Sequence, residues 1–225
     1  MLHIVPYQKP TYEFVLFNIK NPNFISQYSA MQTIVVPTDF SPEARNAGLY
    51  AAELAKIFSA KLVLFHAYML PTPVSEVPYV MITVDELQKE NEILVKKEVE
   101  SLNQAYGVQT EGIVRIGIPS DEIRALSEDL SIDLVVMGMK GAGGIDKMIG
   151  STTTNAIRKL KAPVLVIPTH CGFSPIKNIT YASDFSYGIT PGLFKPVIRL
   201  AKTFDAKIHV INVHRHKDDM KTGQM

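Results

Sequence analysis

Residues 137–154, MGMKGAGGIDKMIGSTTT, place glycines and then hydroxyl side chains where an apolar strand runs into a helix. Glycine lets the backbone come close to a ligand, and a helix N-terminus offers unpaired N–H donors and the positive end of the helix dipole. Gly141, Gly150, Ser151 and Thr152 therefore have the composition of a phosphate-binding loop. A flexible glycine-rich loop without a ligand is the alternative, and the loop sequence alone leaves both interpretations open.

Asp39 is the second residue whose type and position suggest binding chemistry. It follows the apolar run TIVVP, residues 33–37, and lies two residues before Ser41, which a Pro-Glu pair marks as the N-cap of a helix. Because Ser41 fills the capping role, we interpret Asp39 as a ligand-binding residue. A carboxylate accepts hydrogen bonds from a ribose or an adenine amino group but repels phosphates, so Asp39 and Ser151 are expected at opposite ends of one ligand.

The elements that must position these residues alternate between strand and helix through residues 32–168. Apolar runs predict strands at 33–37, 61–68, 108–116, 133–138 and 163–168. Helical spacing and capping signals predict helices at 42–58, 83–106, 119–130 and 151–160. Such alternation implies right-handed crossovers and a parallel sheet covered by helices on both faces.

We therefore expect an α/β protein with a doubly wound, Rossmann-like fold whose five-stranded parallel sheet has the order 3-2-1-4-5. In this order strands 1 and 4 are neighbours at the topological switch point, and ligands bind beyond the carboxyl ends of such strands. Asp39 follows strand 1 and Gly138 ends strand 4. Both should face one cleft.

Residues 179–214 resemble residues 34–68. The sequence Ser-Asp-Phe-Ser from Ser183 echoes Thr-Asp-Phe-Ser from Thr38, and LAKTFDAKIHV echoes LAKIFSAKLVL. This self-similarity indicates a tandem duplication whose second copy stops after its second strand, as a partial β-α-β repeat. The second copy has no glycine loop, so Asp184 is not expected to serve a complete nucleotide site. A piece this small needs the first domain or another chain to lie against, or it stays partly disordered.

These patterns divide the chain into an N-terminal extension (1–30), a complete domain (31–170) and a truncated repeat with a polar tail (171–225). The extension has little periodicity, and two interpretations stay open. It is either the product of an over-extended reading frame whose true start is Met31, or an arm that packs on the complete domain. The arm would use its aromatic and apolar residues Tyr12, Phe14, Val15 and Phe17.

Taken together, these motifs resemble the universal stress protein family. The residues that carry the resemblance are Pro-Thr-Asp-Phe-Ser after the first strand, Phe-His-Ala in the second, Met-Gly-x-x-Gly with a later Gly-Ser-Thr, and the Pro-Val-Leu-Val strand. Nucleotide-binding members of the family carry nine residues between Gly-x-x-Gly and Gly-Ser or Gly-Thr. Here eight residues, 142–149, separate Gly141 from Gly150, so the loop is one residue shorter than the pattern.

The resemblance implies ATP, with or without Mg²⁺, as the ligand. It implies that Asp39 contacts the adenosine, that the Ala67 backbone meets the adenine and that Met137 and Gly138 lie near the ribose. The later glycines and hydroxyl residues would hold the phosphates. The expected nucleotide site comprises Pro37, Thr38, Asp39, Ala67, Met137, Gly138, Gly141, Gly150, Ser151 and Thr152.

We interpret the protein as an ATP-binding stress-response or regulatory protein that acts by nucleotide-dependent association. The alternatives are a nucleotide-independent dimeric interaction module of the same fold and a slow ATPase or phosphotransferase with Ser151 or Thr152 as phosphate acceptor. No GxxxxGK[ST] motif is present, so fast nucleotide hydrolysis is not expected. We expect neither a catalytic residue nor a metal site, and we interpret His66 as a hydrogen-bonded structural residue.

Composition limits which classes of partner and which cellular compartment are expected. The net charge is +1, with 46% hydrophobic and 20% charged residues. This balance gives no electrostatic reason to expect nucleic acid or an anionic membrane. The single cysteine fits a reducing compartment, and we expect a cytoplasmic protein. The apolar edge strand Val164 to Ile167 predicts a homodimer, formed by this strand or by the partial repeat.

Overall fold

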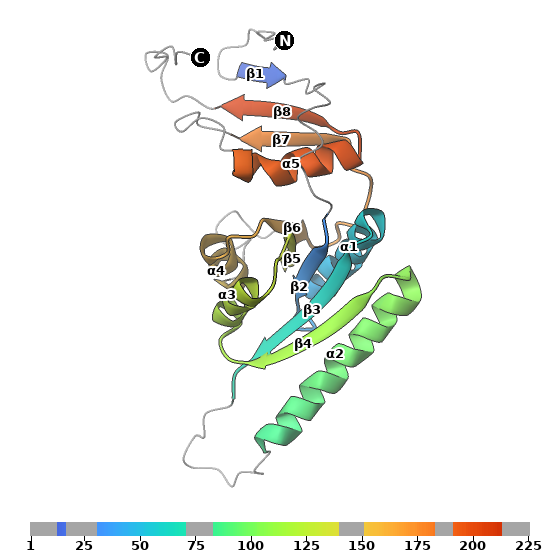
Figure 1. Cartoon of the computed structure of the whole chain (residues 1–225), viewed down its shortest axis with the longest axis vertical. Coiled ribbons are helices and arrows are strands. Elements are labelled where there is room, and N and C mark those ends of the chain that lie inside the picture. Colours follow the sequence, from blue (N-terminus) through green and yellow to red (C-terminus); the bar gives the residue numbers. More distant parts are fainter. Residues whose placement is uncertain (1–12, 17–30, 71–82, 140–150, 183–190, 213–225) are drawn as a thin grey trace. The chain divides into compact units, whose positions relative to one another are not determined.

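The computed structural model describes residues 13–16, 31–70, 83–139, 151–182 and 191–212 (Figure 1). Contacts group the chain into two compact units. One comprises residues 30–173, and the other comprises residues 1–29 together with 174–225. The division of the native chain into domains stays a prediction.

The larger unit contains the predicted five-stranded parallel sheet. Its strands are β2 (Thr33–Pro37), β3 (Lys61–Tyr68), β4 (Thr110–Ile116), β5 (Leu134–Met139) and β6 (Val164–Pro168). They lie in the order β4-β3-β2-β5-β6, with every neighbouring pair parallel. This is the order 3-2-1-4-5, so the predicted doubly wound fold is confirmed.

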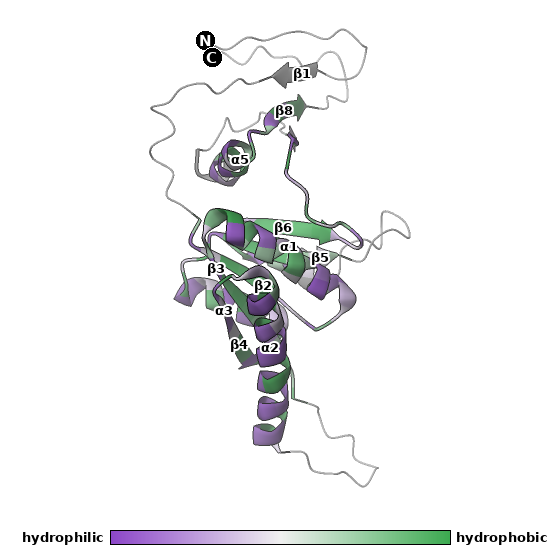
Figure 2. Ribbon diagram, turned by 90° about the vertical axis from the view of Figure 1, so that its right-hand side faces the viewer, coloured by the Kyte–Doolittle hydropathy of each residue, from purple (hydrophilic) through white to green (hydrophobic). Residues whose placement is uncertain are grey.

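Two helices cover each face of this sheet. The helices are α1 (Pro42–Phe58), α2 (Val84–Tyr106), α3 (Pro119–Asp129) and α4 (Ser151–Lys159). α1 contacts α2 on one face, and α3 contacts α4 on the other (Figure 1). Because helices lie on both faces, the central strands are buried on both, and β2, β3 and β5 are rich in buried apolar residues. β6 appears in green in Figure 2, whereas the long helix α2 is largely hydrophilic.

Local capping explains where the helices begin and end. The Ser41 hydroxyl accepts a hydrogen bond from the backbone N–H of Ala44 at the start of α1. A capping box between Thr83 and Glu86 begins α2, and Gly107 in the left-handed conformation ends it. These three signals were predicted from the sequence and are confirmed.

Three predicted strands start slightly later in the structure: β6 begins at Val164, and at the other two a side chain binds the backbone near the boundary. β4 begins two residues late, where the Asn103 side chain accepts a hydrogen bond from the backbone N–H of Thr110. β5 begins after Asp133, whose carboxylate accepts hydrogen bonds from the backbone N–H groups of Gln32 and Thr33. In both places side-chain hydrogen bonds to the backbone set the strand boundary.

The smaller unit is a three-stranded sheet with one helix. β7 (Asn178–Ala182) and β8 (Lys207–Asn212) pair in parallel, joined by α5 (Pro191–Thr203). β1 (Glu13–Leu16) pairs antiparallel with the outer edge of β8. The core of this unit consists of Phe194, Ile198, Ala201, Ile208 and Val210.

The pairing of β1 corrects the interpretation of the N-terminal residues. One of the two interpretations placed an arm from this segment on the complete domain, whereas residues 13–16 pair with the partial repeat. A strand-helix-strand piece buries too little surface to be stable alone. The N-terminal segment supplies a third strand, which is support that neither sequence interpretation included.

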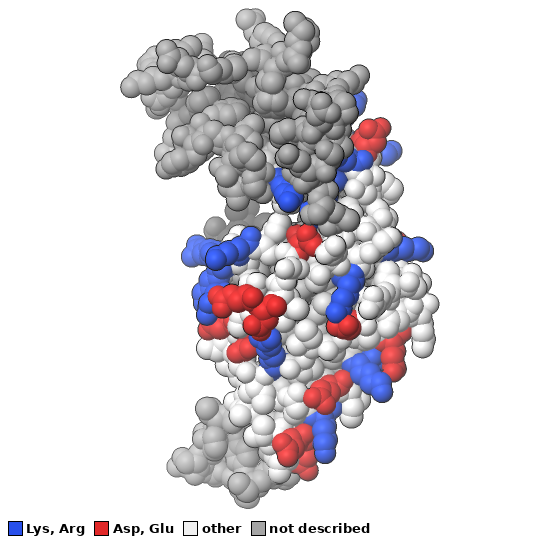
Figure 3. Space-filling view, viewed as in Figure 1, with Lys and Arg blue, Asp and Glu red and all other residues white. Residues whose placement is uncertain are grey.

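Surface charges of both signs alternate on the face shown in Figure 3. Over the described residues no helix is long and apolar enough to span a membrane.

Candidate functional site

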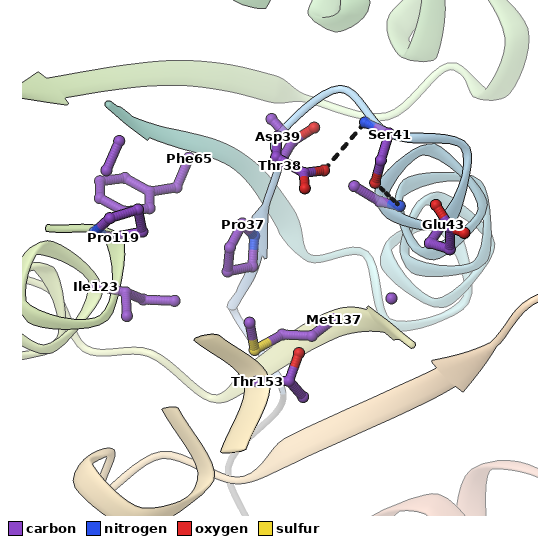
Figure 4. Close-up of a pocket in the computed structure, with 13 residues that line it drawn as sticks. Pro37, Thr38, Asp39, Ser41, Glu43, Phe65, Pro119, Ile123, Met137 and Thr153 are labelled. Atoms are coloured by element: carbon purple, nitrogen blue, oxygen red, sulfur yellow. Dashed lines mark hydrogen bonds between the residues drawn. The ribbon is translucent and has the colours of Figure 1, made fainter. Parts of the chain in front are cut away.

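A pocket of about 330 Å³ lies at the carboxyl ends of β2, β3 and β5 (Figure 4). The start of α1 and the first turns of α3 and α4 complete its wall. This position is the topological switch point of the sheet, where doubly wound folds bind ligands. Its volume falls at the lower end of the range for small-molecule sites.

Six of the ten predicted site residues line this pocket. They are Pro37, Thr38, Asp39, Ala67, Met137 and Gly138. Gly141 and Gly150 lie outside the described residues. Ser151 and Thr152 form the first two positions of α4, but their side chains are not described. Contact of any of the ten with a nucleotide stays a prediction.

The turn from Thr38 to Ser41 brings Asp39 to the pocket. Its ends are fixed by the Thr38 N–H, which donates to the Phe65 oxygen at 2.8 Å, and by the Ser41 N–H, which donates to Asp39 Oδ1 at 3.0 Å. The Thr38 hydroxyl oxygen accepts a hydrogen bond from the Phe40 N–H at 3.0 Å. This turn leaves Asp39 exposed at the rim, with Ser41 capping α1 as predicted.

Packing requires a glycine at position 138, which the sequence did not reveal. A Cβ atom at this position would clash with the backbone carbonyl of Glu43 and lie 3.0 Å from the backbone nitrogen of Ala44. The end of β5 therefore touches the first turn of α1 directly. Glycine is required here for the approach of two elements, in addition to any approach by a ligand.

Sequence reasoning missed seven residues that line the pocket. They are Ser41, Glu43, Ala44, Phe65, Pro119, Ile123 and Thr153. Thr153 is buried and is the third residue of α4, so the run of three threonines could have indicated it. Pro119 and Ile123 belong to α3, and no motif connects them with the glycine loop.

The pocket is apolar on one side and acidic on the other. Pro37, Phe65, Ile123 and Met137 supply apolar surface, whereas Asp39 and Glu43 supply carboxylates. Among the described residues no lysine or arginine lines it. The described side chains therefore suit an uncharged ring system and hydroxyl groups. Neutralisation of a phosphate would come from the N-terminus of α4 and the loop before it.

Metal binding by protein side chains finds no support in the described part of the chain, where no group of His, Cys, Asp and Glu residues could hold an ion. The expectation that His66 is a hydrogen-bonded residue is confirmed. The ring is buried and contacts a backbone oxygen and an asparagine side chain.

A doubly wound parallel sheet with a pocket at its switch point places the chain among the Rossmann-like α/β proteins. The pattern of the Universal stress protein family matches residues 31–168. The chain belongs to this family, as the sequence motifs predicted.

Individual relatives agree with this assignment. A universal stress protein of Methanocaldococcus jannaschii is 30% identical over 142 residues, which cover 60% of this chain and 80% of that protein. One of Synechocystis is 29% identical over 138 residues, covering 61% and 85%. The crystal structure of a universal stress protein from Archaeoglobus fulgidus has a TM-score of 0.63 at 20% identity, covering 79% of this chain and 65% of that one. This likeness shows the fold.

Proposed function

We propose that the protein binds ATP in the pocket at the switch point and acts as a nucleotide-dependent stress-response protein. The observation that carries the proposal is the convergence of Asp39, Gly138 and Thr153 on one pocket. The three residues come from the ends of β2 and β5 and the first turn of α4. Sequence motifs about 100 residues apart thus meet where a doubly wound fold binds its ligand.

The side chains that line the pocket suggest how a bound nucleotide would be oriented. The adenine ring would lie against the apolar side chains of Ile123 and Met137 and the backbone of Ala67. Asp39 would accept hydrogen bonds from the ribose hydroxyls. Because Asp39 and Glu43 repel negative charge, the phosphates would point away from them, toward Ser151 and Thr152 at the start of α4. Mg²⁺ would be held chiefly by the phosphates, as this ion usually is.

Calorimetric titration of the full chain with ATP tests the proposal. We expect binding by the wild type and at least a tenfold loss of affinity in Asp39→Ala, because a hydrogen bond to a charged group contributes about 1.5–3 kcal/mol. Asp184→Ala is the matched control, since Asp184 is the sequence counterpart of Asp39 in the partial repeat. Binding that is equal in both variants, or no binding by the wild type, would contradict the proposal.

The alternatives make different predictions for the same sample. A nucleotide-independent interaction module would associate equally with and without ATP. A slow ATPase would release phosphate faster than buffer. We favour regulated binding because the described part of the pocket holds no lysine or arginine to stabilise a transferring phosphoryl group.

We also propose a cytoplasmic homodimer. β6 is an edge strand of the five-stranded sheet and pairs only with β5 in the described residues. Its residues Val164 to Ile167 are apolar, and unpaired apolar edges favour association. Light scattering at micromolar concentration should give twice the chain mass. Val166→Lys should give a monomer, whereas retention of the dimer in this variant would assign the interface to the partial repeat.

A further inference from the structure

The segment that follows β6, residues 169–173, lies outside the family match but inside the larger unit. The universal stress protein pattern covers residues 31–168, whereas contacts group the chain with the larger unit as far as Phe173. These five residues therefore pack with the larger unit although the family pattern does not include them. We refer to them as the post-β6 segment.

The backbone oxygen of Met139 accepts two hydrogen bonds from this segment. The Thr169 N–H donates to it at 3.0 Å, and the Thr169 hydroxyl donates to it at 2.8 Å. The first bond continues the parallel pairing of β5 with β6, in which Met139 faces Pro168. The second bond needs the threonine side chain and uses the other lone pair of the carbonyl oxygen. Met139 is the last residue of β5, so the two bonds fix the point where that strand ends.

A turn and a side chain of α1 hold the post-β6 segment in place. The Cys171 N–H donates to the Pro168 oxygen at 3.0 Å and closes the turn, in which His170 has a φ of 67°. Histidine adopts this left-handed conformation more often than most residues do. The Nδ2 group of Asn46 on α1 donates to the Pro168 oxygen at 3.3 Å and to the Cys171 oxygen at 3.2 Å. Asn46 therefore joins both ends of the turn to α1.

Helix α1 contacts the ends of both β5 and β6. Its first turn, at Glu43, lies against Gly138 in β5, and Asn46 binds the end of β6 one turn later. Tyr50 lies four residues after Asn46 on the same side of the helix, and its ring meets that of Phe173 edge-on, with 5.2 Å between the centroids. The ends of the two strands are therefore held against each other and against one helix.

The pocket and the glycine-rich sequence meet at the end of β5. Met137 and Gly138 line the pocket, and residues 140–150 follow Met139 directly in the sequence. Met137 and Gly138 are already placed by their regular pairing with β6, which needs no side chain. The Thr169 hydroxyl acts on the next residue, from which the chain continues toward the start of α4, where the phosphates are expected.

We propose that Thr169 is a positioning residue for the phosphate end of the nucleotide site: its hydroxyl holds the Met139 carbonyl, and Asn46 holds the turn that carries this hydroxyl. The proposal rests on the ATP-binding function proposed above. A bond that biases the position of a binding element changes the affinity by no more than the free energy of that bond. Loss of the hydroxyl should therefore weaken ATP binding by about threefold to tenfold, the range for one hydrogen bond. Adenosine, which has no phosphate, should bind with unchanged affinity.

Calorimetry of the full chain with ATP and with adenosine tests this difference. Thr169→Val removes the donor and keeps the shape of the side chain, and Thr169→Ser keeps the hydroxyl and should restore the ATP affinity. Unchanged adenosine affinity also shows that each variant is folded.

Thr110→Val is the matched control for this comparison. The Thr110 hydroxyl also donates to a backbone oxygen, that of Val108, but at the amino end of β4. This variant should bind ATP like the wild type. The positioning role would be overturned by an equal loss for ATP and adenosine in Thr169→Val, by no loss of either, or by an ATP loss that Thr110→Val shares.

Asn46→Ala tests whether α1 acts through Thr169. It should weaken ATP binding in the wild type and cause no further loss in Thr169→Val, because residues that act on one contact are not additive. In the nucleotide-free chain, NMR should show faster hydrogen exchange of the Thr169 and Cys171 amides in Asn46→Ala. Additive losses of affinity, or unchanged exchange, would overturn the part assigned to Asn46. No ATP binding by the wild type would overturn the positioning role together with the proposed function, whereas wild-type binding without the expected difference between ATP and adenosine would overturn the positioning role alone.

Discussion

The segment β7-α5-β8 repeats the backbone frame of β2-α1-β3 with a different burial pattern. Ile34 pairs with Leu62 in the larger unit, and Ile179 pairs with Ile208 in the smaller one, in the same parallel register. In each unit these residues belong to the face that the intervening helix covers. A strand-helix-strand sequence therefore sets its own register, whatever surrounds it.

The opposite faces of the two sheets differ. Val35 and Val63 are buried beneath α3 and α4, whereas their counterparts Thr180 and His209 are polar and not buried. The smaller unit thus has one apolar face, which α5 covers, and an opposite face on which Thr180 and His209 are not buried. A second apolar face is present only where a second layer of helices buries it, because apolar burial is the main stabilising contribution.

The largest expected effect on stability comes from truncating the paired core side chains of the two units to alanine. Leu62→Ala should lower the free energy of unfolding of residues 30–173 by about 2–5 kcal/mol, because Leu62 is fully buried. Ile208→Ala should leave that unit unchanged and destabilise only the smaller one. Urea denaturation with hydrogen exchange resolved by peptide measures both. If Ile208→Ala also destabilises residues 30–173, the two units unfold as one.

An intermediate effect, on the local stability of the smaller unit, is expected from removing β1. Deletion of residues 1–16 should reduce the amide protection of β8, since β1 is its only partner on the outer edge among the described residues. Deletion of residues 1–12 retains β1 and serves as the control. Hydrogen exchange of peptides from 207–212 reports the difference. Equal protection after both deletions would show that the N-terminal strand contributes nothing to the smaller unit.

The smallest effect concerns the residues that end the two equivalent helices. Ser59 and Asp205 both adopt the left-handed conformation, at φ 52° and 49°. Ser59→Gly should stabilise the larger unit by up to about 1 kcal/mol, because glycine has no Cβ to strain. Asp205→Gly should gain less, since aspartate tolerates this conformation better than serine. Thermal unfolding and hydrogen exchange check the order, and a larger gain at Asp205 would contradict it.

Much of the larger unit could be predicted because its signals are local. The caps at Ser41 and Thr83 and the stop at Gly107 act within one turn, and apolar runs mark the strands. The order of the strands followed from alternation alone, and with it came the convergence of Asp39 and Gly138. The family motifs added the expected ligand, which stays a proposal.

The features that the sequence did not predict depend on contacts between distant segments of the chain. The clash that requires glycine at 138 involves the first turn of α1, about 95 residues earlier in the chain. β1 pairs with β8 across nearly 200 residues, and no sequence signal links them. Pairings of this kind depend on how whole elements pack, which local propensity and periodicity do not encode.

The sequence by itself predicted the universal stress protein family, the doubly wound fold and the meeting of Asp39 and Gly138 at the switch point, because alternating strands and helices favour right-handed crossovers and a parallel sheet. The tertiary structure alone decided which further side chains, Ile123 and Thr153 among them, line that cleft. It also placed the His66 ring between the backbone oxygen of Thr38 and the side chain of Asn91. Only the packing of α2 on β3 and the turn after β2 bring these partners together, because they lie far apart in the sequence.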